Sequence, residues 1–205
     1  MKNELLVLTN YTFPLFSYLL GSIPFGLLFS KIKGKDPRKY GSGNIGATNI
    51  ARVIGKKWGI FTLICDLLKG LIPVFLAKIA GVSDFFIALT GLFAVCGHCF
   101  SIFLGFKGGK GVATALGVFL GICPLAVAFG AFIFGIALYY SKFVSVGSLS
   151  AATSMPIFIY LFCNNSFYEA MAWTICFIIW IRHKDNLIRL AKGEEKGINF
   201  RSQET

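Results

Sequence analysis

The feature of this sequence that most constrains its fold is a series of long stretches with almost no charged residue. They cover residues 12–30, 58–77, 85–104, 112–141, 143–167 and 170–181. A helix that crosses a bilayer needs roughly 20 such residues. Only 14% of the 205 residues are charged and 56% are apolar, and a chain this short cannot hide so much apolar surface from water. We therefore predict an all-α fold, a polytopic membrane helix bundle.

The longest stretch, residues 112–141, is too long for one crossing. Gly121, Cys123 and Pro124 lie near its middle, and glycine and proline break helices, so we expect two shorter helices there. This gives about seven transmembrane helices, although five or six also fit. The first stretch has neither a strongly basic leader nor a small-residue cleavage site, so we expect a retained helix. We treat residues 1–205 as a single integral membrane domain.

The positive charge of the chain lies mostly in its polar segments. The formal net charge is +11. If the N-terminus is outside and the chain crosses seven times, only Lys2 and Lys78 fall outside. The other basic residues fall on the cytoplasmic side, mainly in loops at about 33–57, 105–111 and 182–205. Because Lys and Arg favour the cytoplasmic side, we predict an outer N-terminus and a cytoplasmic C-terminus. Topology alone accounts for many of these charges.

The six cysteines do not have the spacing of a metal site. They lie at positions 65, 96, 99, 123, 163 and 176, mostly inside the apolar stretches. Cys96, His98 and Cys99 are close in sequence, but a structural zinc site usually takes four well-spaced ligands. We expect buried free thiols that act as small apolar side chains. No metal and no cofactor is predicted.

The first polar loop reads GSGNIGATNIAR over residues 41–52. Its opening matches GxGxxG, but no strand precedes it and an apolar span follows, so a dinucleotide site is rejected. Glycines still allow backbone N–H groups to approach an anion. Ser42, Asn44, Thr48 and Asn49 can form hydrogen bonds, and Arg52 offers a planar fork suited to phosphate. The plainer alternative is a solvated turn with helix-capping residues.

The second polar loop brings glycines and lysines to the start of an apolar helix. Lys107, Gly108, Gly109, Lys110 and Gly111 precede the apolar run that begins at residue 112. This is not a Walker motif, which requires Ser or Thr after the lysine and a strand before the loop. The N–H groups and dipole of a helix start form an anion site nevertheless. Thr114 can add a hydroxyl. The alternative is a flexible basic loop on anionic lipid headgroups.

The third polar segment follows the last apolar stretch. Arg182, His183, Asn186 and Arg189 are spaced so that they can share one helical face. Taken alone, this segment is typical of a basic juxtamembrane tail.

Charged residues also occur inside the apolar stretches. Asp66 and Lys69, three residues apart, are expected to form an ion pair on one helix face. His98 is expected either as a satisfied core imidazole or as part of the site.

Together these segments resemble the PlsY family of bacterial membrane acyl-phosphate:glycerol-3-phosphate acyltransferases. The resemblance covers nearly the whole chain. It is carried by GSGNIGATNIAR (41–52), DLLKG (66–70), GHCFSIFLGFKGGKGVAT (97–114), SVGSL (145–149) and RHKDNLIRL with GEE (182–195). The family often has proline where Ser101 stands. Its conserved acid aligns with Glu195 or Glu194, and its serine with Ser145 or Ser148.

The resemblance implies a reaction and a location. A fatty acyl-phosphate donates its acyl group to the 1-hydroxyl of sn-glycerol 3-phosphate, giving 1-acyl-sn-glycerol 3-phosphate (lysophosphatidic acid) and phosphate. This is the first acylation of phospholipid biosynthesis, and it is expected at the cytoplasmic face of the cell inner membrane. The two substrates and the lipid bilayer are the expected partners. Nucleic acid is not expected, and the sequence does not indicate a protein partner.

The resemblance also implies roles for individual residues. The expected catalytic residues are His183, Asn186 and Lys110. The residues expected to bind glycerol 3-phosphate are Ser42, Asn44, Thr48, Asn49, Arg52 and Ser145. Those expected to bind acyl-phosphate are Lys107, Gly108, Gly109, Gly111 and Thr114. Asp66, Lys69, His98 and Glu195 are expected to support them.

The chemistry expected from these residues is proximity and charge stabilisation. An acyl phosphate has a good leaving group, and the chain has neither a GxSxG elbow nor an HxxxxD pair. Either a substrate phosphate or His183 can take the hydroxyl proton. Two other functions were weighed. An organic-phosphate transporter would usually show internal repeats and a midplane site, which the sequence lacks. A metal-dependent CDP-alcohol phosphotransferase would need several aspartates.

Overall fold

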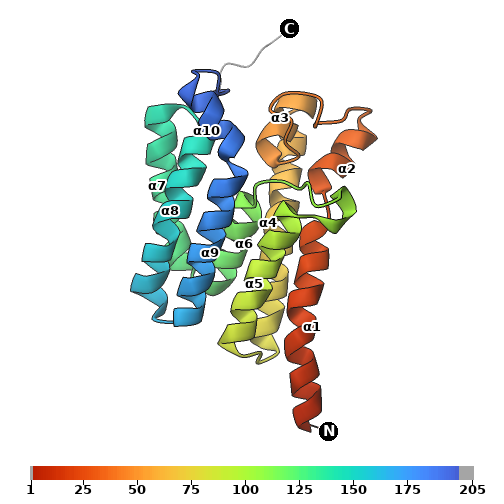
Figure 1. The fold of residues 1–205 in the computed structure, drawn as a ribbon, viewed down its shortest axis with the longest axis vertical. Helices are drawn as coiled ribbons and strands as arrows, with labels where there is room; N and C mark the ends of the chain where they lie inside the picture. Colours follow the sequence, from red (N-terminus) through yellow and green to blue (C-terminus); the bar gives the residue numbers. More distant parts are fainter. Residues whose placement is uncertain (1, 199–205) are drawn as a thin grey trace.

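The computed structural model of the chain describes residues 2–198, and every regular element in this part is helical (Figure 1). The elements are α1 (Lys2–Ser22), α2 (Phe25–Ile32), α3 (Ala47–Ile54), α4 (Lys56–Ile79), α5 (Asp84–Cys99), the 3-10 turn η1 (Ile102–Leu104), α6 (Val112–Ile122), α7 (Pro124–Ser141), α8 (Val144–Cys163), α9 (Ser166–Arg182) and α10 (Lys184–Ala191). The predicted all-α fold is confirmed. Residues 199–205 of the third polar segment lie outside the described residues.

Several of these helices are long and apolar enough to cross a membrane. Within the described residues there are five such stretches, namely Asn10–Ile32, Lys56–Ile79, Asp84–Leu104, Pro124–Ser141 and Val144–Cys163. This agrees with a multi-pass membrane protein. The number of seven crossings and the orientation of the termini stay predictions.

The break expected inside residues 112–141 is present. Helix α6 ends at Ile122, and Pro124 occupies the first turn of α7. With 11 residues, α6 is about 16 Å long, only about half the hydrocarbon thickness of a bilayer. It packs tightly on α4, because a Cβ on Gly117 would lie 1.9 Å from the Leu67 carbonyl oxygen. A Cβ on Gly70 would lie 2.2 Å from the Thr114 oxygen. Such close helix contacts need small residues.

The first apolar stretch, residues 12–30, lies within one of the candidate membrane spans, but its helix is not continuous as the sequence predicts. The helix is interrupted between α1 and α2, where Pro24 lacks the N–H group that would continue the hydrogen bonds. Two carbonyls exposed by the break find partners inside the protein. Ser22 accepts a hydrogen bond from the Ser101 hydroxyl at 2.6 Å, and Ile23 accepts one from the Lys69 ammonium at 3.1 Å. Ser101, where the family often has proline, thus secures the break.

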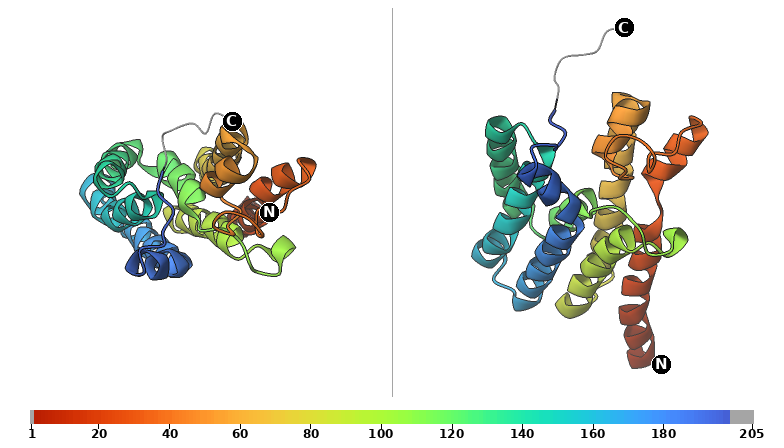
Figure 2. Two further views of the ribbon diagram at one scale, coloured as in Figure 1. Left: turned by 90° about the horizontal axis from the view of Figure 1, so that it is seen from above. Right: turned by 45° about the horizontal axis from the view of Figure 1, so that its top comes forward.

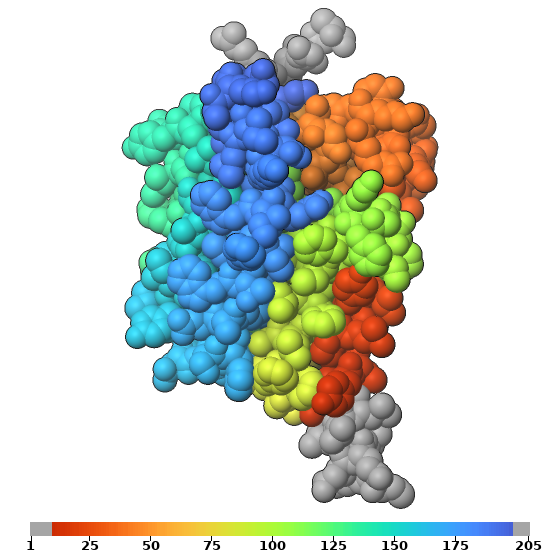
Figure 3. Space-filling model, in the orientation of Figure 1, coloured from red at the N-terminus to blue at the C-terminus, as the bar shows by residue number. Residues whose placement is uncertain are grey.

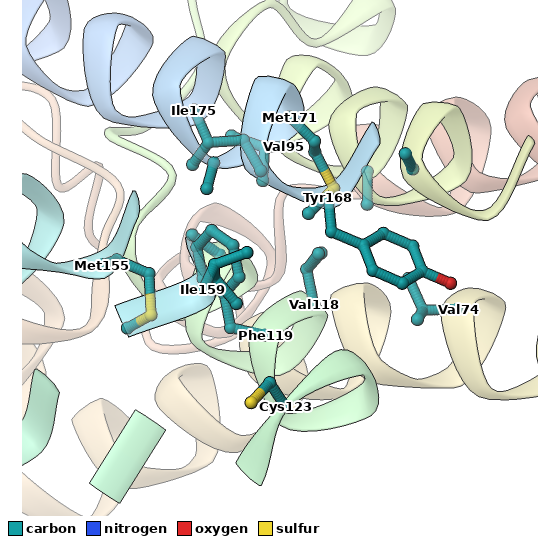
Figure 4. Close-up of a cluster of buried hydrophobic side chains, with 14 of the residues drawn as sticks. Val74, Val95, Val118, Phe119, Cys123, Met155, Ile159, Tyr168, Met171 and Ile175 are labelled. Carbon is teal, nitrogen blue, oxygen red and sulfur yellow. The ribbon is translucent and has the colours of Figure 1, made fainter. Parts of the chain in front are cut away.

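Helices α6 and α9 lie between two groups of helices (Figure 1). Helices α7 and α8 pack on one side, and α1, α4 and α5 on the other. Apolar side chains from α4, α5, α6, α8 and α9 meet in one buried cluster, of which Figure 4 labels Val74, Val95, Val118, Phe119, Ile159, Met171 and Ile175. The cluster holds α6 and α9 in place, so the polar residues that follow α9 and precede α6 have fixed positions.

Candidate active site

Three polar segments that are far apart in sequence meet at the end of the bundle that carries α2, α3 and α10 (Figure 1). In the space-filling view the segment around α3 and the segment around α10 touch at this end (Figure 3). Arg52 donates a hydrogen bond to the Lys196 carbonyl at 2.9 Å, and the Lys196 ammonium donates one to the Gly41 carbonyl at 2.8 Å. The first loop and the C-terminal segment therefore form one surface.

Glu195 is the centre of a side-chain network at this surface. Its carboxylate accepts hydrogen bonds from Ser145 at 2.8 Å, Asn186 at 2.6 Å and Arg189 at 2.8 Å. Burial alone would raise the pKa of Glu195, but these hydrogen bonds outweigh it and keep the pKa below its ordinary value. Glu194 is exposed. Between the alternatives left by the sequence, the structure joins Ser145 to Glu195.

Lys110 enters the same network from the second loop. Its ammonium donates a hydrogen bond to the Asn186 side-chain oxygen at 2.5 Å. Burial lowers the pKa of Lys110 to about 8, and nearby Arg189 and Arg52 act in the same direction, while Glu195 opposes them. An anionic group such as a phosphate beside Lys110 would raise this pKa again, because a nearby negative charge favours the charged form of lysine.

His183 lies at the junction between α9 and α10 and is almost fully buried. Its Nδ1 atom is 2.8 Å from the Ile179 carbonyl oxygen. From that geometry we assign the ring proton to Nδ1, which leaves Nε2 as the acceptor. Burial, followed by the charge of Lys110, lowers the pKa of His183 to about 4. The imidazole is therefore neutral near pH 7.

The sequence predicts that Arg182, His183, Asn186 and Arg189 can share one helical face, and the structure corrects this. Helix α9 ends at Arg182, and α10 begins only after His183. Asn186 and Arg189, on α10, both reach Glu195. Arg182 instead donates hydrogen bonds to the second loop. Because of the break between the two helices, Arg182 contacts the second loop, whereas Asn186 and Arg189 contact Glu195.

The first loop is held together by Asn49, which is buried in α3. Its side-chain oxygen accepts from the Ser42 N–H at 2.8 Å, and its amide donates to the carbonyls of Pro37, Tyr40 and Asn44. This amide is fully used inside the loop. We therefore revise its expected role from binding glycerol 3-phosphate to holding the loop.

The other polar residues of the first loop differ in how far they are available. The Asn44 side-chain oxygen accepts from the Gly46 N–H at 2.8 Å, so it too stabilises the turn. Ser42 is half-buried, and Thr48 is exposed. Arg52 and Ser42 remain the residues of this loop best placed to meet a ligand, because Arg52 faces the C-terminal segment.

In the second loop, Gly108 and Gly109 cannot serve as the expected phosphate cradle. The Gly108 N–H donates to the Cys99 carbonyl at 3.1 Å and the Gly109 N–H to the His98 carbonyl at 2.9 Å. Both N–H donors are therefore occupied within the protein. The first N–H groups of a helix have no partner within it, and α6 begins directly after Gly111, which has a left-handed φ of 84°.

The remaining residues of the second loop lie in different environments. Lys107 is exposed. Thr114, in the first turn of α6, is fully buried, and its hydroxyl oxygen has no hydrogen-bond partner among the described residues. Burying a hydroxyl without a hydrogen-bond partner costs free energy. The Thr114 hydroxyl is therefore available to bond a polar group at the start of α6.

The expected ion pair between Asp66 and Lys69 is present and buried, with 2.9 Å between carboxylate and ammonium. His98 lies beside it, with Nδ1 3.7 Å from the Asp66 carboxylate. These three residues lie among helices α4 and α5, beneath the second loop. Lys69 donates to the Ile23 carbonyl at the break after α1, and the His98 carbonyl accepts from Gly109 in the loop before α6, so both residues support these segments.

Two functional residues received no role from the sequence. Arg189 holds Glu195, and Arg182 holds the second loop. The end of α9 and the connection between α5 and α6, which this contact joins, can be followed in Figure 2. Both arginines looked like ordinary members of a basic juxtamembrane segment. The sequence signal that could have identified them is their position: Arg182 is next to His183, and Arg189 lies three residues after Asn186. Among the described residues, no group of three His, Cys, Asp or Glu side chains is placed to hold a metal ion.

Comparison with known proteins identifies the family. A family model described as glycerol-3-phosphate acyltransferase matches residues 11–193. A glycerol-3-phosphate acyltransferase from Desulfotalea psychrophila is 48% identical over 191 residues, which cover 91% of this chain and 97% of the relative. One from Geobacter sulfurreducens is 46% identical over 179 residues, covering 87% and 92%.

Solved structures agree with this family. The crystal structure of PlsY, an integral membrane glycerol 3-phosphate acyltransferase, in its glycerol 3-phosphate form has a TM-score of 0.89 and 40% identity, covering 93% of this chain and 96% of that one. Its lysophosphatidic acid form has a TM-score of 0.86 and 39% identity, covering 93% and 95%. The chain therefore belongs to the glycerol-3-phosphate acyltransferase family.

Proposed function

We propose that this protein transfers the acyl group of a fatty acyl-phosphate to the 1-hydroxyl of sn-glycerol 3-phosphate. The products are 1-acyl-sn-glycerol 3-phosphate and phosphate, and the step is the first acylation of phospholipid biosynthesis. The observation that carries the proposal is the network of Ser145, Lys110, Asn186 and Glu195. It joins three distant segments around a half-buried lysine beside a neutral histidine.

The acceptor, glycerol 3-phosphate, is assigned to the space between the first loop and α10. Arg52 and Lys110 supply the positive charge, and Arg52 keeps its charge at any pH that the protein tolerates. Ser42, Ser145 and Asn186 supply neutral hydrogen bonds. Charge-assisted hydrogen bonds are about twice as strong as neutral ones, so the two cations carry most of the affinity for phosphate.

The phosphate of the donor is assigned to the N-terminus of α6. The N–H groups of its first turn and the helix dipole favour an anion there. Lys110 precedes this turn and Thr114 belongs to it, while exposed Lys107 draws the donor toward the loop. The acyl chain of such a donor can remain among apolar helices, because the site lies at their polar end.

We assign the acceptance of the hydroxyl proton to a substrate phosphate. A general base works best when its pKa is near the operating pH. The pKa of His183 is lowered to about 4, whereas the second pKa of a phosphate monoester is about 6. His183 then orients the hydroxyl through Nε2. If Nε2 were the base, the variant H183A would lose orders of magnitude in kcat while its affinity for glycerol 3-phosphate stayed unchanged.

The membrane arrangement belongs to the same proposal. Seven crossings, an outer N-terminus and a cytoplasmic C-terminus would place the site at the cytoplasmic face of the inner membrane. The support is the basic character of the polar end of the bundle. The chain would then act as one integral membrane domain, close to its water-soluble acceptor.

An acyl-transfer assay on the purified protein tests the reaction. With a fatty acyl-phosphate and glycerol 3-phosphate together, we expect equal amounts of phosphate and 1-acyl-sn-glycerol 3-phosphate. With either substrate omitted, or with acyl-CoA as donor, we expect neither product. Transfer from acyl-CoA would contradict the donor. Uptake of glycerol 3-phosphate into proteoliposomes without acyl transfer would favour the organic-phosphate transporter instead.

A further inference from the structure

Gly108 and Gly109 form a pair of peptides whose four backbone polar groups are all held by the protein. The two N–H groups donate to the carbonyls of Cys99 and His98, at 3.1 and 2.9 Å. The two carbonyls accept from Arg182, which donates from Nη2 to Gly108 at 2.6 Å and from Nε to Gly109 at 2.9 Å. One guanidinium therefore closes a loop whose other edge is fixed by the end of α5.

Contact with His98 explains why these two positions are glycine. A Cβ on Gly108 would lie 2.0 Å from the His98 carbonyl oxygen, and a Cβ on Gly109 would lie 2.1 Å from His98 Nε2. The loop is thus pressed against His98 on one side and bonded to Arg182 on the other. His98 is itself buried beside Asp66, so this side of the loop has little freedom to move.

Arg182 is well suited to hold two successive carbonyls. Its guanidinium is planar and presents several donors in a fixed fork, which the single ammonium of lysine cannot reproduce. The guanidinium also lies 5.7 Å from the centre of the Phe100 ring, an arrangement that favours a cation over an aromatic face. Arg182 is the last residue of α9 and directly precedes His183.

We propose that Arg182 is a positioning residue for the donor loop. By holding both glycine carbonyls, it sets where Lys110 and the first turn of α6 lie relative to His183 and Asn186. The inference rests on the proposed function, because the start of α6 is there assigned to the acyl-phosphate. Two consecutive residues then have separate tasks. Arg182 positions the loop that binds the acyl-phosphate, and His183 contacts the glycerol 3-phosphate. Because the two residues are consecutive, the two substrate sites keep a fixed relative position.

Variants at this position test the proposal in steady-state kinetics with a fatty acyl-phosphate and glycerol 3-phosphate. The variants are Arg182→Lys, which keeps the charge but loses the fork, and Arg182→Gln, which loses the charge. Arg38→Lys and Arg38→Gln are matched controls, because Arg38 is exposed and pairs only with Asp36 among the interactions of the described residues. Thermal unfolding is followed for each variant.

We expect the KM for acyl-phosphate to rise about tenfold or more in both Arg182 variants, since hydrogen bonds to a charged group are lost. The KM for glycerol 3-phosphate should change less than about threefold, within the scatter of weak indirect effects. Added guanidinium ion should restore the KM for acyl-phosphate in Arg182→Gln and have no effect on the Arg38 variants. A side chain needed only for folding would give neither the selective KM change nor the rescue.

The possible results separate the two proposals. If the unmodified protein transfers no acyl group from acyl-phosphate, the proposed function itself is wrong. If it does, but Arg182→Lys has unchanged KM values or both KM values rise together, the positioning role is refuted. If Arg182→Gln does not fold, Arg182→Lys decides the question alone.

Discussion

The loop at residues 41–46 is held mainly by one side chain close in sequence, whereas the loop at residues 105–111 is held by the end of α5 and by a side chain of α9. In the first loop a single amide, that of Asn49, bonds to four positions of the surrounding segment. In the second, the end of α5 and Arg182 hold the peptides of Gly108 and Gly109 from opposite sides. The first loop is thus mainly a local unit, joined to the C-terminal segment through Lys196, and the second depends on how α5, α6 and α9 pack.

Gly43 of the first loop is glycine for a different reason than Gly108 and Gly109 of the second. Gly43 has a left-handed φ angle of 71°, which a residue with a Cβ adopts at a cost. Gly108 and Gly109 are needed because there is no space for a Cβ. Glycine-rich segments that look alike in a sequence can thus have different reasons for their composition, and substitutions should reveal the difference.

The largest effect is expected for Gly108→Ala. Its Cβ would collide with the backbone oxygen of His98, which cannot turn away as a side chain could. The loop and Lys110 must therefore move, and a misplacement of about 1 Å costs on the order of a hundredfold in rate. We expect kcat/KM for acyl-phosphate, measured in the acyl-transfer assay, to fall by that amount.

Two alanine variants serve as controls for Gly108→Ala. Gly135 lies in α7, and a Cβ added there would have nothing within 4 Å, so Gly135→Ala should keep full activity. At Gly43 a Cβ meets only the Arg38 carbonyl at 3.4 Å, so Gly43→Ala should cost about 1 kcal/mol of stability through its φ angle. Equal losses at Gly43 and Gly108 would break the distinction between the loops.

The next largest effect is expected for Arg52→Ala, which removes the permanent cation beside the first loop. A charge-assisted hydrogen bond contributes about 1.5–3 kcal/mol, so the KM for glycerol 3-phosphate should rise about ten- to a hundredfold. The KM for acyl-phosphate should change little. Arg38→Ala, in the same segment, is the control. An unaltered KM for glycerol 3-phosphate would remove Arg52 from the acceptor site.

A smaller effect is expected for Asn49→Asp, which preserves size but replaces an amide donor by a carboxylate. The carbonyls of Pro37, Tyr40 and Asn44 then lose their donor. Because Asn49 acts on the first loop, we expect the KM for glycerol 3-phosphate to rise about three- to tenfold. The KM for acyl-phosphate should be unaffected. A parallel rise in both constants would mean that the first loop also supports the donor side.

The smallest effect near pH 7 is expected for Lys110→Arg. This variant tests whether the second loop depends on a cation that loses its charge with rising pH, unlike Arg52 of the first loop. The pKa of Lys110 is lowered to about 8, so its charge is present below that pH and is lost as the pH rises through it. In the unmodified protein kcat/KM should fall above about pH 8. In the variant this fall should disappear, since arginine stays charged.

Lys107→Arg is the matched control for that pH profile. Lys107 is exposed, so the decline above the pKa of Lys110 should remain in this variant. Persistence of the decline in Lys110→Arg would assign it to a different group and remove Lys110 as the titrating cation of the site.

The helical fold could be predicted because its signal is local. Runs of apolar residues, the break around Pro124 and the pair of Asp66 and Lys69 follow from composition and from helix periodicity. The break at Pro24 was missed, because proline inside an apolar run is also tolerated in membrane helices. The interrupted helix is stabilised there by hydrogen bonds from Lys69, on α4, and from Ser101, in the α5–η1 connection.

By itself, the sequence determined the chemical inventory of the site: which loops carry glycine, which cations stand near them, and which family they resemble. Only the tertiary structure decided how each residue is used. Asn49 bonds to the backbone of its own loop. Glu195 accepts hydrogen bonds from Ser145, Asn186 and Arg189. Arg182 bonds to the second loop and not to Glu195. The physical reason is that a hydrogen bond depends on distance and direction between two groups. Lys110 and Asn186 are 76 positions apart in the chain, and local spacing does not contain that information.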